Sequence, residues 1–468
     1  MTAHTSAHRG NSAASRDIAH VLKPYTNLKK HQTTGSLMIA RGDGIRVYDE
    51  AGKEYIEGMA GLWCASLGFS EKRLAKAAAE AMDRLPFYHS FTHKGHDVAA
   101  DLAEKLLSIA PVPMSKVFFA SSGSEANDTV VKMVWYYNNA LGRPQKKKII
   151  SRQRAYHGVT VASASLTGLP NNHRSFDLPI ANILHVECPH HYRYAEPGES
   201  EEAFAARLAD SLERRILEEG PDTIAAFIAE PVMGAGGVIL PPKGYFARVQ
   251  EILRKYDILF IADEVICGFH RTGEMWGSQT YGLKPDILTT AKALSAAYLP
   301  ISAVMVNEQV YQVLAGESDR IGTFGHGFTY TGHPVAAAVA LETLRIYEED
   351  RIGEHVKRVS PRFLEHLRRL ADRPLVGDAR GVGLTGGVEL MADKKNRIPF
   401  PAEAMVPTYL IARAHEHGVI LRPIMDVIAF CPPLIIDEAG IDEMFRRFDL
   451  ALRDTEAMVA EQGLAKVT

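Results

Sequence analysis

Asp286-Ile-Leu-Thr-Thr-Ala-Lys-Ala-Leu-Ser295 places a single lysine, Lys292, in a run of apolar and small residues. The segment Leu259-Phe-Ile-Ala-Asp-Glu-Val-Ile266 precedes it and has the pattern of a buried strand that ends in acidic residues. A lysine in such surroundings is desolvated, which lowers the pKa of its amine and lets the neutral amine form a Schiff base with an aldehyde. Taken alone, a surface lysine and a strand-end cap at Asp263 explain these two residues equally well.

Asp263 gives the lysine a chemical partner if the aldehyde is carried by a pyridine ring. A carboxylate at the end of a buried strand can hold a pyridine nitrogen protonated, so that the ring acts as an electron sink. Pyridoxal 5'-phosphate is such an aldehyde. Its binding also requires a phosphate site and an aromatic residue beside the ring, and the sequence offers candidates for both.

The candidate phosphate site follows a short apolar strand, Lys116-Val-Phe-Phe-Ala-Ser121. Ser122-Gly-Ser-Glu-Ala-Asn-Asp128 comes next and opens a long helix with apolar periodicity. A turn of small residues at a helix N-terminus offers free N–H groups, hydroxyls and the positive end of the helix dipole to an anion. Ser122, Gly123 and Ser124 are therefore the predicted phosphate cradle. The same letters also fit an ordinary capping box, and both interpretations can hold together.

The candidate aromatic residue is Tyr156, in Ala155-Tyr-His-Gly-Val159 after the strand Lys148-Ile-Ile-Ser151. Turns that follow strands of a parallel α/β sheet line the ligand crevice. We expect Tyr156 to lie flat on a pyridine ring and His157 to support it from below. A buried core tyrosine is the alternative.

Several motifs together resemble the class III aminotransferases, from about residue 20 to near the C-terminus. They are Ser122-Gly-Ser-Glu-Ala-Asn-Asp128, Tyr156-His-Gly158, Ala229-Glu-Pro-Val232, Asp263-Glu-Val265, Thr289-Thr-Ala-Lys292 and His326-Gly-Phe-Thr-Tyr-Thr-Gly-His-Pro334. The resemblance implies the α/β fold type I of pyridoxal phosphate transferases, the aspartate aminotransferase superfamily. That fold has a large domain with a mostly parallel sheet and a small α/β lobe, and it works as a homodimer.

Within this family the chain is most similar to the ω-transaminases, the amine:pyruvate group. The motifs that carry this similarity are Gly61-Leu-Trp-Cys64, Met233-Gly-Ala-Gly-Gly237, Glu264-Val-Ile-Cys-Gly268 and Val419-Ile-Leu-Arg-Pro423. The resemblance implies a ping-pong transfer of an amino group from a primary amine or ω-amino acid to an α-keto acid, with pyruvate as the expected acceptor. An aminomutase or decarboxylase on the same scaffold, and a non-catalytic binding protein, are the alternatives.

The resemblance also implies roles for single residues. Lys292 would carry the cofactor and move the proton, Asp263 would pair with the pyridine nitrogen, and Tyr156 and Val265 would lie on the two ring faces. The other implied cofactor contacts are Ser122, Gly123, Ser124, His157, Glu230, Ile266 and, from the neighbouring subunit, Thr329. Arg422 would be a mobile arginine that grips the substrate carboxylate and pairs with Glu230, and Trp63 and Phe91 would form the walls for the donor. A structural ion pair is the alternative for Arg422, and plain core packing is the alternative for the two aromatic residues.

Two positions depart from related branches. Ile266 stands where ornithine-type members carry a glutamine, which favours the amine:pyruvate branch. His270 stands where a small glycine is usual, and we expect a solvated loop histidine there, with a position at the pocket entrance as the alternative.

Composition supports an enzyme of the cytoplasm. The net charge of −3 provides no basic surface for nucleic acid. Four widely separated cysteines are typical of reduced thiols, and no run is apolar enough to span a membrane. The histidines and cysteine gathered at His89, His93 and His96, and at Cys188, His190 and His191, lack the spacing of a metal site, so we expect none.

The pattern of elements predicts the domain organisation. We expect a disordered tail over 1–16, an N-terminal segment of the small domain over 17–65, the large cofactor-binding domain over 66–335 and a C-terminal small domain over 336–468. Buried strands that alternate with helices over 66–335 predict a mostly parallel sheet covered on both faces.

Overall fold

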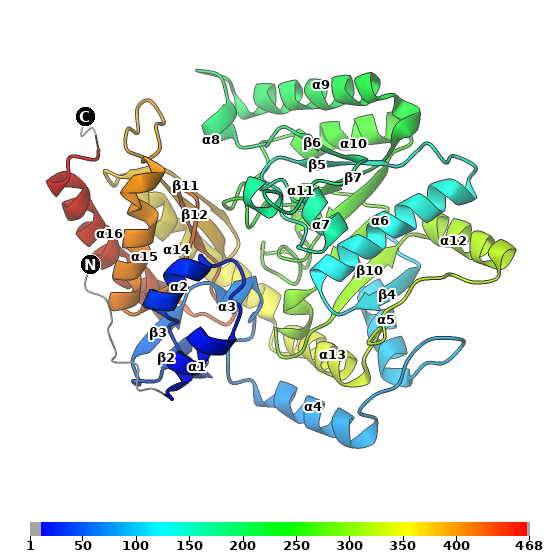
Figure 1. Cartoon of the computed structure of the whole chain (residues 1–468), viewed down its shortest axis with the longest axis horizontal. Coiled ribbons are helices and arrows are strands. Elements are labelled where there is room, and N and C mark those ends of the chain that lie inside the picture. Colours follow the sequence, from blue (N-terminus) through cyan, green and yellow to red (C-terminus); the bar gives the residue numbers. More distant parts are fainter. Residues whose placement is uncertain (1–10, 466–468) are drawn as a thin grey trace.

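A seven-stranded sheet forms the centre of the computed structural model, which describes residues 11–465 (Figure 1). Its order and bounds are β4 (Lys116–Ala120), β10 (Ser302–Val306), β9 (Ile287–Thr290), β8 (Leu259–Asp263), β7 (Ile224–Ala229), β5 (Lys148–Arg152) and β6 (Ile183–Val186). Strands β6, β5, β7, β8 and β9 pair in parallel, and β10 runs antiparallel to both of its neighbours. This arrangement confirms the predicted fold class.

Helices cover both faces of this sheet because its strands are apolar on both sides. In β8, Ile261 packs into a cluster with α6 and α12, whereas Phe260 packs into a cluster with α9 and α10 on the other face. The helices of this part of the chain are α4 (Lys72–Arg84), α5 (Asp97–Ser108), α6 (Gly123–Ala140), α7 (Val161–Leu166), α8 (His191–Tyr194), α9 (Glu201–Glu219), α10 (Tyr245–Lys255), α11 (Gly277–Tyr281), α12 (Glu308–Ile321) and α13 (Pro334–Glu349). The sheet is thus a rigid support, and the loops at its edge can present functional side chains.

Two four-stranded sheets lie beside the large one, on the left of Figure 1. The first contains β1 (Ile39–Asp43), β2 (Arg46–Asp49), β3 (Glu54–Glu57) and β13 (Val419–Ile420), and the second contains β11 (Val376–Val382), β12 (Thr385–Leu390), β15 (Val427–Phe430) and β14 (Arg422–Ile424). The helices of these regions are α1 (Ala13–His20), α2 (Leu28–Thr34), α3 (Ala60–Trp63), α14 (Ile352–Leu370), α15 (Val406–Glu416) and α16 (Glu438–Glu461). Because β13 pairs in parallel with β3, the two ends of the chain meet in one sheet.

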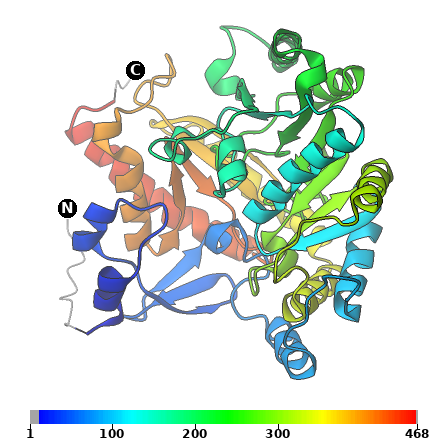
Figure 2. The same cartoon turned by 45° about the vertical axis from the view of Figure 1, so that its right-hand side comes forward.

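The turned view in Figure 2 also places the N-terminal helices beside the C-terminal ones. This agrees with the expectation that 17–65 and 336–468 belong together, although the exact domain bounds stay a prediction. The expected tail over 1–16 falls mainly on residues 1–10, which lie outside the described residues, and Ala13 already begins α1. Ser12 caps that helix by accepting the N–H of Ser15. No helix within residues 11–465 is long and apolar enough to cross a membrane.

Candidate functional site

A cavity of about 400 Å³ opens where several parallel strands of the large sheet end. Open α/β sheets bind ligands at this carboxyl edge. The cavity brings together most of the residues predicted from the sequence, namely Ser122, Gly123, Ser124, Tyr156, His157, Glu230, Asp263, Val265, Ile266 and Lys292. They come from the loops after β4, β5, β7, β8 and β9. The fold therefore brings into one cavity residues that are distributed over more than one third of the sequence.

The carboxylate of Asp263 is held by a network of hydrogen bonds. Its Oδ2 atom lies 2.7 Å from His157 Nδ1 and 2.9 Å from Asn127 Nδ2, and its Oδ1 atom accepts the N–H of Val265 at 3.1 Å. The side chains of Asp263 and His157 are almost fully buried. Such a network fixes the direction of the carboxylate and stabilises its charge. His157 therefore contacts Asp263, a contact that the sequence did not predict, and its support of Tyr156 stays a prediction.

Lys292 follows β9 and borders the same cavity. Its φ of 51° is left-handed, a strained conformation for a lysine that turns the chain sharply after the strand. Burial lowers the pKa of the Lys292 amine, and the nearby Asp263 carboxylate counteracts part of that effect. No hydrogen bond or ion pair joins this amine to another described residue, so it is free to react.

The N-terminus of α6 is built as an anion site. Ser122 is the N-cap and accepts the N–H of Glu125 at 3.1 Å, so the capping interpretation holds. The N–H groups of Gly123 and Ser124 at the start of α6 keep no acceptor within the described chain. A Cβ on Gly123 would lie 3.2 Å from both methyl groups of Val265, which form the facing wall. A side chain at position 123 would therefore crowd the cavity.

Tyr156 lies at the mouth of the cavity beside two groups from distant parts of the chain. Burial raises the pKa of its phenol, the contact with Tyr25 raises it further, and the Arg422 guanidinium lowers it in part. Tyr25 belongs to the segment between α1 and α2, and its hydroxyl also accepts a hydrogen bond from Asn172 at 2.5 Å. Tyr25 thus holds the N-terminal segment across this side of the cavity.

The carboxyl group of Glu230 does not pair with Arg422 as expected. Its two oxygens accept the N–H groups of Tyr156 and Gly234, each at 3.0 Å. Burial raises the pKa of Glu230. Arg422 begins β14, where its backbone pairs with Ala429, but its guanidinium makes no hydrogen bond or ion pair with another described residue, so a structural ion pair is not its role either. Glu230 therefore shapes the loop that carries Tyr156.

The remaining predicted residues lie outside the cavity wall. Trp63 is buried in a cluster with Ile266, which does line the cavity. Phe91 is 42% exposed, and a Cβ on Gly327 would lie 2.9 Å from the end of its ring. Thr329, on the same loop as Gly327, is exposed. Phe91 and Thr329 therefore sit together on the outside of the single chain.

His270 is another expectation that the structure corrects. It packs against α14, where a Cβ on Gly353 would lie 2.6 Å from its ring, and it meets Tyr347 edge-on at 6.2 Å. Burial lowers the pKa of His270 to about 4. The residue is a neutral packing group and not a solvated loop histidine.

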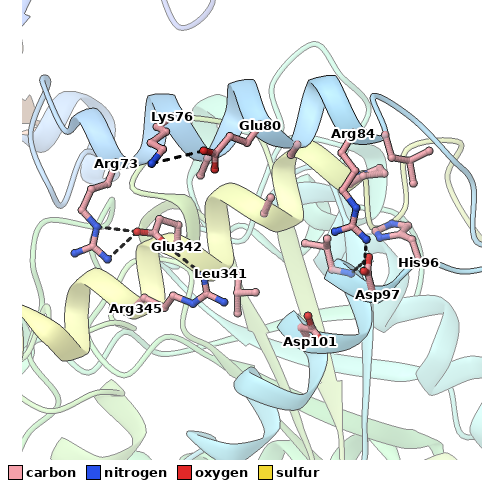
Figure 3. A pocket seen from close by; sticks show the side chains of 16 residues that line it. Arg73, Lys76, Glu80, Arg84, His96, Asp97, Asp101, Leu341, Glu342 and Arg345 are labelled. Atoms are coloured by element: carbon pink, nitrogen blue, oxygen red, sulfur yellow. Dashed lines mark hydrogen bonds and ion pairs between the residues drawn. The ribbon is translucent and has the colours of Figure 1, made fainter.

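A second hollow of about 570 Å³ lies between α4, α5 and α13, away from these residues (Figure 3). Its charged side chains pair with one another: Arg73 with Glu342 at 2.7 Å, Lys76 with Glu80 at 3.6 Å, and Arg84 with Asp97. Surface pairs of this kind contribute little energy, and they leave Asp101 as the charged lining residue without an ion pair among residues 11–465. The groups that can do chemistry are in the smaller cavity.

Sequence patterns missed two residues of the site. Asn127 lies one helical turn after Gly123, so the i, i+4 spacing could have placed it on the same face of α6. Tyr25 carries no such signal, because its contact with Tyr156 depends on how the N-terminal segment folds back. Within residues 11–465 no group of three or more ligating side chains could hold a metal ion.

The arrangement fits the cofactor that the sequence predicts. A reactive amine at Lys292 and a fixed carboxylate at Asp263 share one cavity with free N–H groups at Gly123 and Ser124. These are the groups that an aldehyde, a pyridine nitrogen and a phosphate require, respectively. Val265 and Tyr156 provide apolar and aromatic walls for a flat ring.

Comparison with known proteins points to the same chemistry. The family model for aminotransferase class-III matches residues 27–452. The gamma aminobutyrate transaminase 3 of Solanum lycopersicum, a chloroplastic protein, is 53% identical over 94% of this chain and 85% of its own length.

Solved structures agree in sequence and in shape. The omega transaminase from Pseudomonas jessenii in complex with PMP is 57% identical, covers 96% of this chain and 99% of its own, and superposes with a TM-score of 0.95. A thermostable omega transaminase variant engineered for asymmetric synthesis of enantiopure bulky amines is also 57% identical, with 96% and 100% coverage and a TM-score of 0.95. In that variant a tryptophan, a phenylalanine and an arginine are replaced.

Proposed function

Because the chain belongs to the class III aminotransferases, which depend on pyridoxal 5'-phosphate, we propose that it transfers the amino group of a primary amine or ω-amino acid to an α-keto acid, with pyruvate as the acceptor. The gamma aminobutyrate transaminase and the omega transaminases among its relatives support an amino group remote from a carboxylate. Pyruvate is the acceptor implied by the resemblance to the amine:pyruvate group.

The observation that carries this proposal is the guanidinium of Arg422, which has no ion-pair partner among residues 11–465 and lies close enough to Tyr156 to lower the pKa of its phenol. A ping-pong enzyme must hold an apolar donor and a carboxylate acceptor in one pocket, one after the other. An arginine without a fixed partner can bind the carboxylate in a bidentate way and move aside for the donor. Trp63, in the apolar cluster with Ile266, supplies the surface for the donor's tail.

The engineered omega transaminase supports these substrate contacts. Its replaced tryptophan, phenylalanine and arginine follow one another at the same intervals as Trp63, Phe91 and Arg422 in this chain. Those replacements serve the synthesis of bulky amines in that protein. By analogy, Trp63, Phe91 and Arg422 define the size and charge of the substrate pocket here.

The chain's own groups perform the proton chemistry. When bound, pyridoxal phosphate withdraws electrons from the bond that breaks at the donor carbon. Burial lowers the pKa of the Lys292 amine, so that the neutral amine can accept the proton from the donor carbon. Lys292 would then deliver this proton to the cofactor. Asp263, fixed by His157 and Asn127, would hold the ring nitrogen of the cofactor protonated. The N–H groups of Gly123 and Ser124 would hold the phosphate.

A homodimer completes the site in this proposal. Phe91 lies beside Gly327, on the loop that carries Thr329, and both Phe91 and Thr329 are exposed in one chain, which leaves them accessible to the pocket of a partner subunit. The same surface carries Phe87, Tyr88 and Tyr330, each at least 39% exposed, which is more aromatic surface than a monomer usually leaves in water. A cytoplasmic location stays a prediction from the cysteine pattern.

An amine panel tests the proposed function. The purified holoenzyme is supplied with an arylalkylamine, a diamine or an ω-amino acid, together with pyruvate or 2-oxoglutarate. We expect alanine to accumulate with one equivalent of aldehyde or ketone. Turnover with 2-oxoglutarate alone would exclude pyruvate as the acceptor, and turnover without any keto acid would indicate another pyridoxal phosphate chemistry.

A further inference from the structure

The segment between β3 and the cavity has an unusual backbone. Ala60, Gly61 and Trp63 have φ angles of 46°, 67° and 65°. Left-handed conformations of residues with side chains are costly and persist only where the surroundings enforce them. This turn carries Trp63, the proposed donor wall, and Cys64, whose thiol is close enough to Lys292 for the two groups to influence each other's charge.

Glu57, the last residue of β3, is hydrogen-bonded to the main chain of this turn. Its side chain is buried, and its Oε1 atom accepts the N–H of Met59 at 2.8 Å. The N–H of Gly61 also donates to this carboxylate. Gly58 fixes the start of the turn, since its N–H donates to Ile420 and its carbonyl accepts the N–H of Cys431, at 2.9 and 2.7 Å.

Glu57 has no cationic partner among residues 11–465. The titratable groups that face it are the thiols of Cys64, on its own segment, and Cys431, which follows β15. Beyond them lie Lys292 on the cavity side and Arg271, whose guanidinium is bonded to the carbonyls of Leu384 and Pro432. A buried carboxylate that satisfies only main-chain N–H groups is costly for stability alone, which suggests a role in holding the turn.

We propose that Glu57 is a positioning residue that holds the left-handed turn 60–63, and with it Trp63, against the donor side of the cavity. The inference rests on the proposed function only in naming Trp63 as the donor wall. The ionised carboxylate is a stronger acceptor for the two N–H groups than the protonated acid. The turn is therefore firm when Glu57 is ionised and looser when it is protonated.

The local electrostatics place this change near neutral pH. Burial raises the pKa of Glu57 to about 7, while the N–H groups of Met59 and Gly61 lower it in part. As the pH falls through that value, the carboxylate gains a proton and releases the turn. The ionised carboxylate therefore holds the turn that carries Trp63 above that pH, and this restraint is lost below it.

Glu57→Gln tests the inference in the holoenzyme, with Glu54→Gln on the same strand as the matched control. The signal of Trp63 is obtained by subtracting the fluorescence of Trp63→Phe, and its exposure is measured by acrylamide quenching across neutral pH. We expect wild type and Glu54→Gln to show quenching that rises as the pH falls, with a midpoint near that of Glu57. Glu57→Gln should show high quenching at every pH.

Kinetics provide a second readout. Glu57→Gln should raise the KM for a bulky amine by up to about a hundredfold, the scale of a misplaced substrate contact, and should change the single-turnover rate with the small keto acid less. Glu57→Asp keeps a titrating carboxylate that reaches the N–H groups less well, so it should move the quenching midpoint.

Wild-type quenching that is independent of pH, or a Glu57→Gln variant that matches wild type, would overturn the inference. If no amine and keto acid pair reacts, the proposed function fails, whereas the quenching measurement still decides the role of Glu57.

Discussion

The cofactor side and the substrate side of the cavity are built in different ways. On the cofactor side, Asp263 is bonded to His157, Asn127 and Val265, and the phosphate cradle is fixed at the start of α6. On the substrate side, the guanidinium of Arg422 has no partner in the described chain, and Phe91 and Thr329 are exposed and do not line the cavity of their own chain.

This difference indicates that the enzyme needs rigid groups around the cofactor and adaptable groups around the substrates. Electrostatic stabilisation of a reacting group requires donors and acceptors that are fixed in advance, and the cofactor side meets that condition within one chain. Two chemically different substrates require groups that can be rearranged or supplied by a second subunit. The predictions below test whether each side behaves in this way.

The largest effect is expected for Lys292→Ala. The variant loses both the amine that binds the cofactor covalently and the group that moves the proton, so turnover should fall by several orders of magnitude. Borohydride reduction of the wild type followed by peptide mapping should locate the cofactor on Lys292. A label on any other lysine would show that the cofactor side has been assigned wrongly.

Mixed dimers test whether the substrate side is shared. We expect Lys292→Ala chains alone to be inactive, and Thr329→Ala chains alone to be weakly active when the cofactor concentration is limiting. In a hybrid, one site carries both lesions and the other carries neither, so activity should return when subunits exchange. Absence of recovery, with exchange verified by native mass spectrometry, would place Thr329 at the site of its own chain.

Asp263→Asn sharpens the role of the cofactor side. A neutral amide cannot hold the ring nitrogen protonated, so the deprotonation step should slow by about a thousandfold, within the usual range for proton-transfer assistance. Cofactor binding should persist in part, because the cradle at Gly123 and Ser124 is intact. Absorbance of the bound cofactor and single-turnover rates measure the two properties separately, and loss of binding alone would contradict the assignment.

The sequence predicts the cofactor side well because its signals are local. Lys292, Asp263 and the Ser122 to Ser124 turn each lie within a few residues of a strand end or helix start, and parallel topology brings such ends to one edge. The seven-stranded sheet follows from the same alternation of strands and helices.

The errors concern contacts between segments that are distant in the chain. His157 follows Tyr156 directly, but only the sheet order, in which β7 separates β5 from β8, shows that the loop after β5 brings His157 to Asp263 at the end of β8. The partner of Glu230 was predicted to be Arg422, although nearby N–H groups already satisfy its carboxylate. Tyr25 reaches Tyr156 from the N-terminal segment, and no local pattern could have indicated this.

The smallest of these effects, and the one that bears most on specificity, is expected for Arg422→Ala. A guanidinium that binds a carboxylate by charged hydrogen bonds contributes about 2–4 kcal/mol when one partner is removed. The pyruvate half-reaction should weaken by that amount. An uncharged amine has no carboxylate that could bind Arg422, so its half-reaction should proceed nearly as in the wild type. Arg422→Lys serves as the matched control, because it keeps the charge but cannot bind in a bidentate way, and it should fall between the two.

Single-turnover absorbance separates the two half-reactions of these variants. Equal damage to both would mean that Arg422 shapes the pocket through packing, and the substrate side would then be as fixed as the cofactor side. Damage confined to pyruvate would instead show that the unpaired guanidinium is kept free for the acceptor. The lack of a partner for Arg422 would then be a requirement of the ping-pong reaction, since a permanent ion pair would compete with the carboxylate in every cycle.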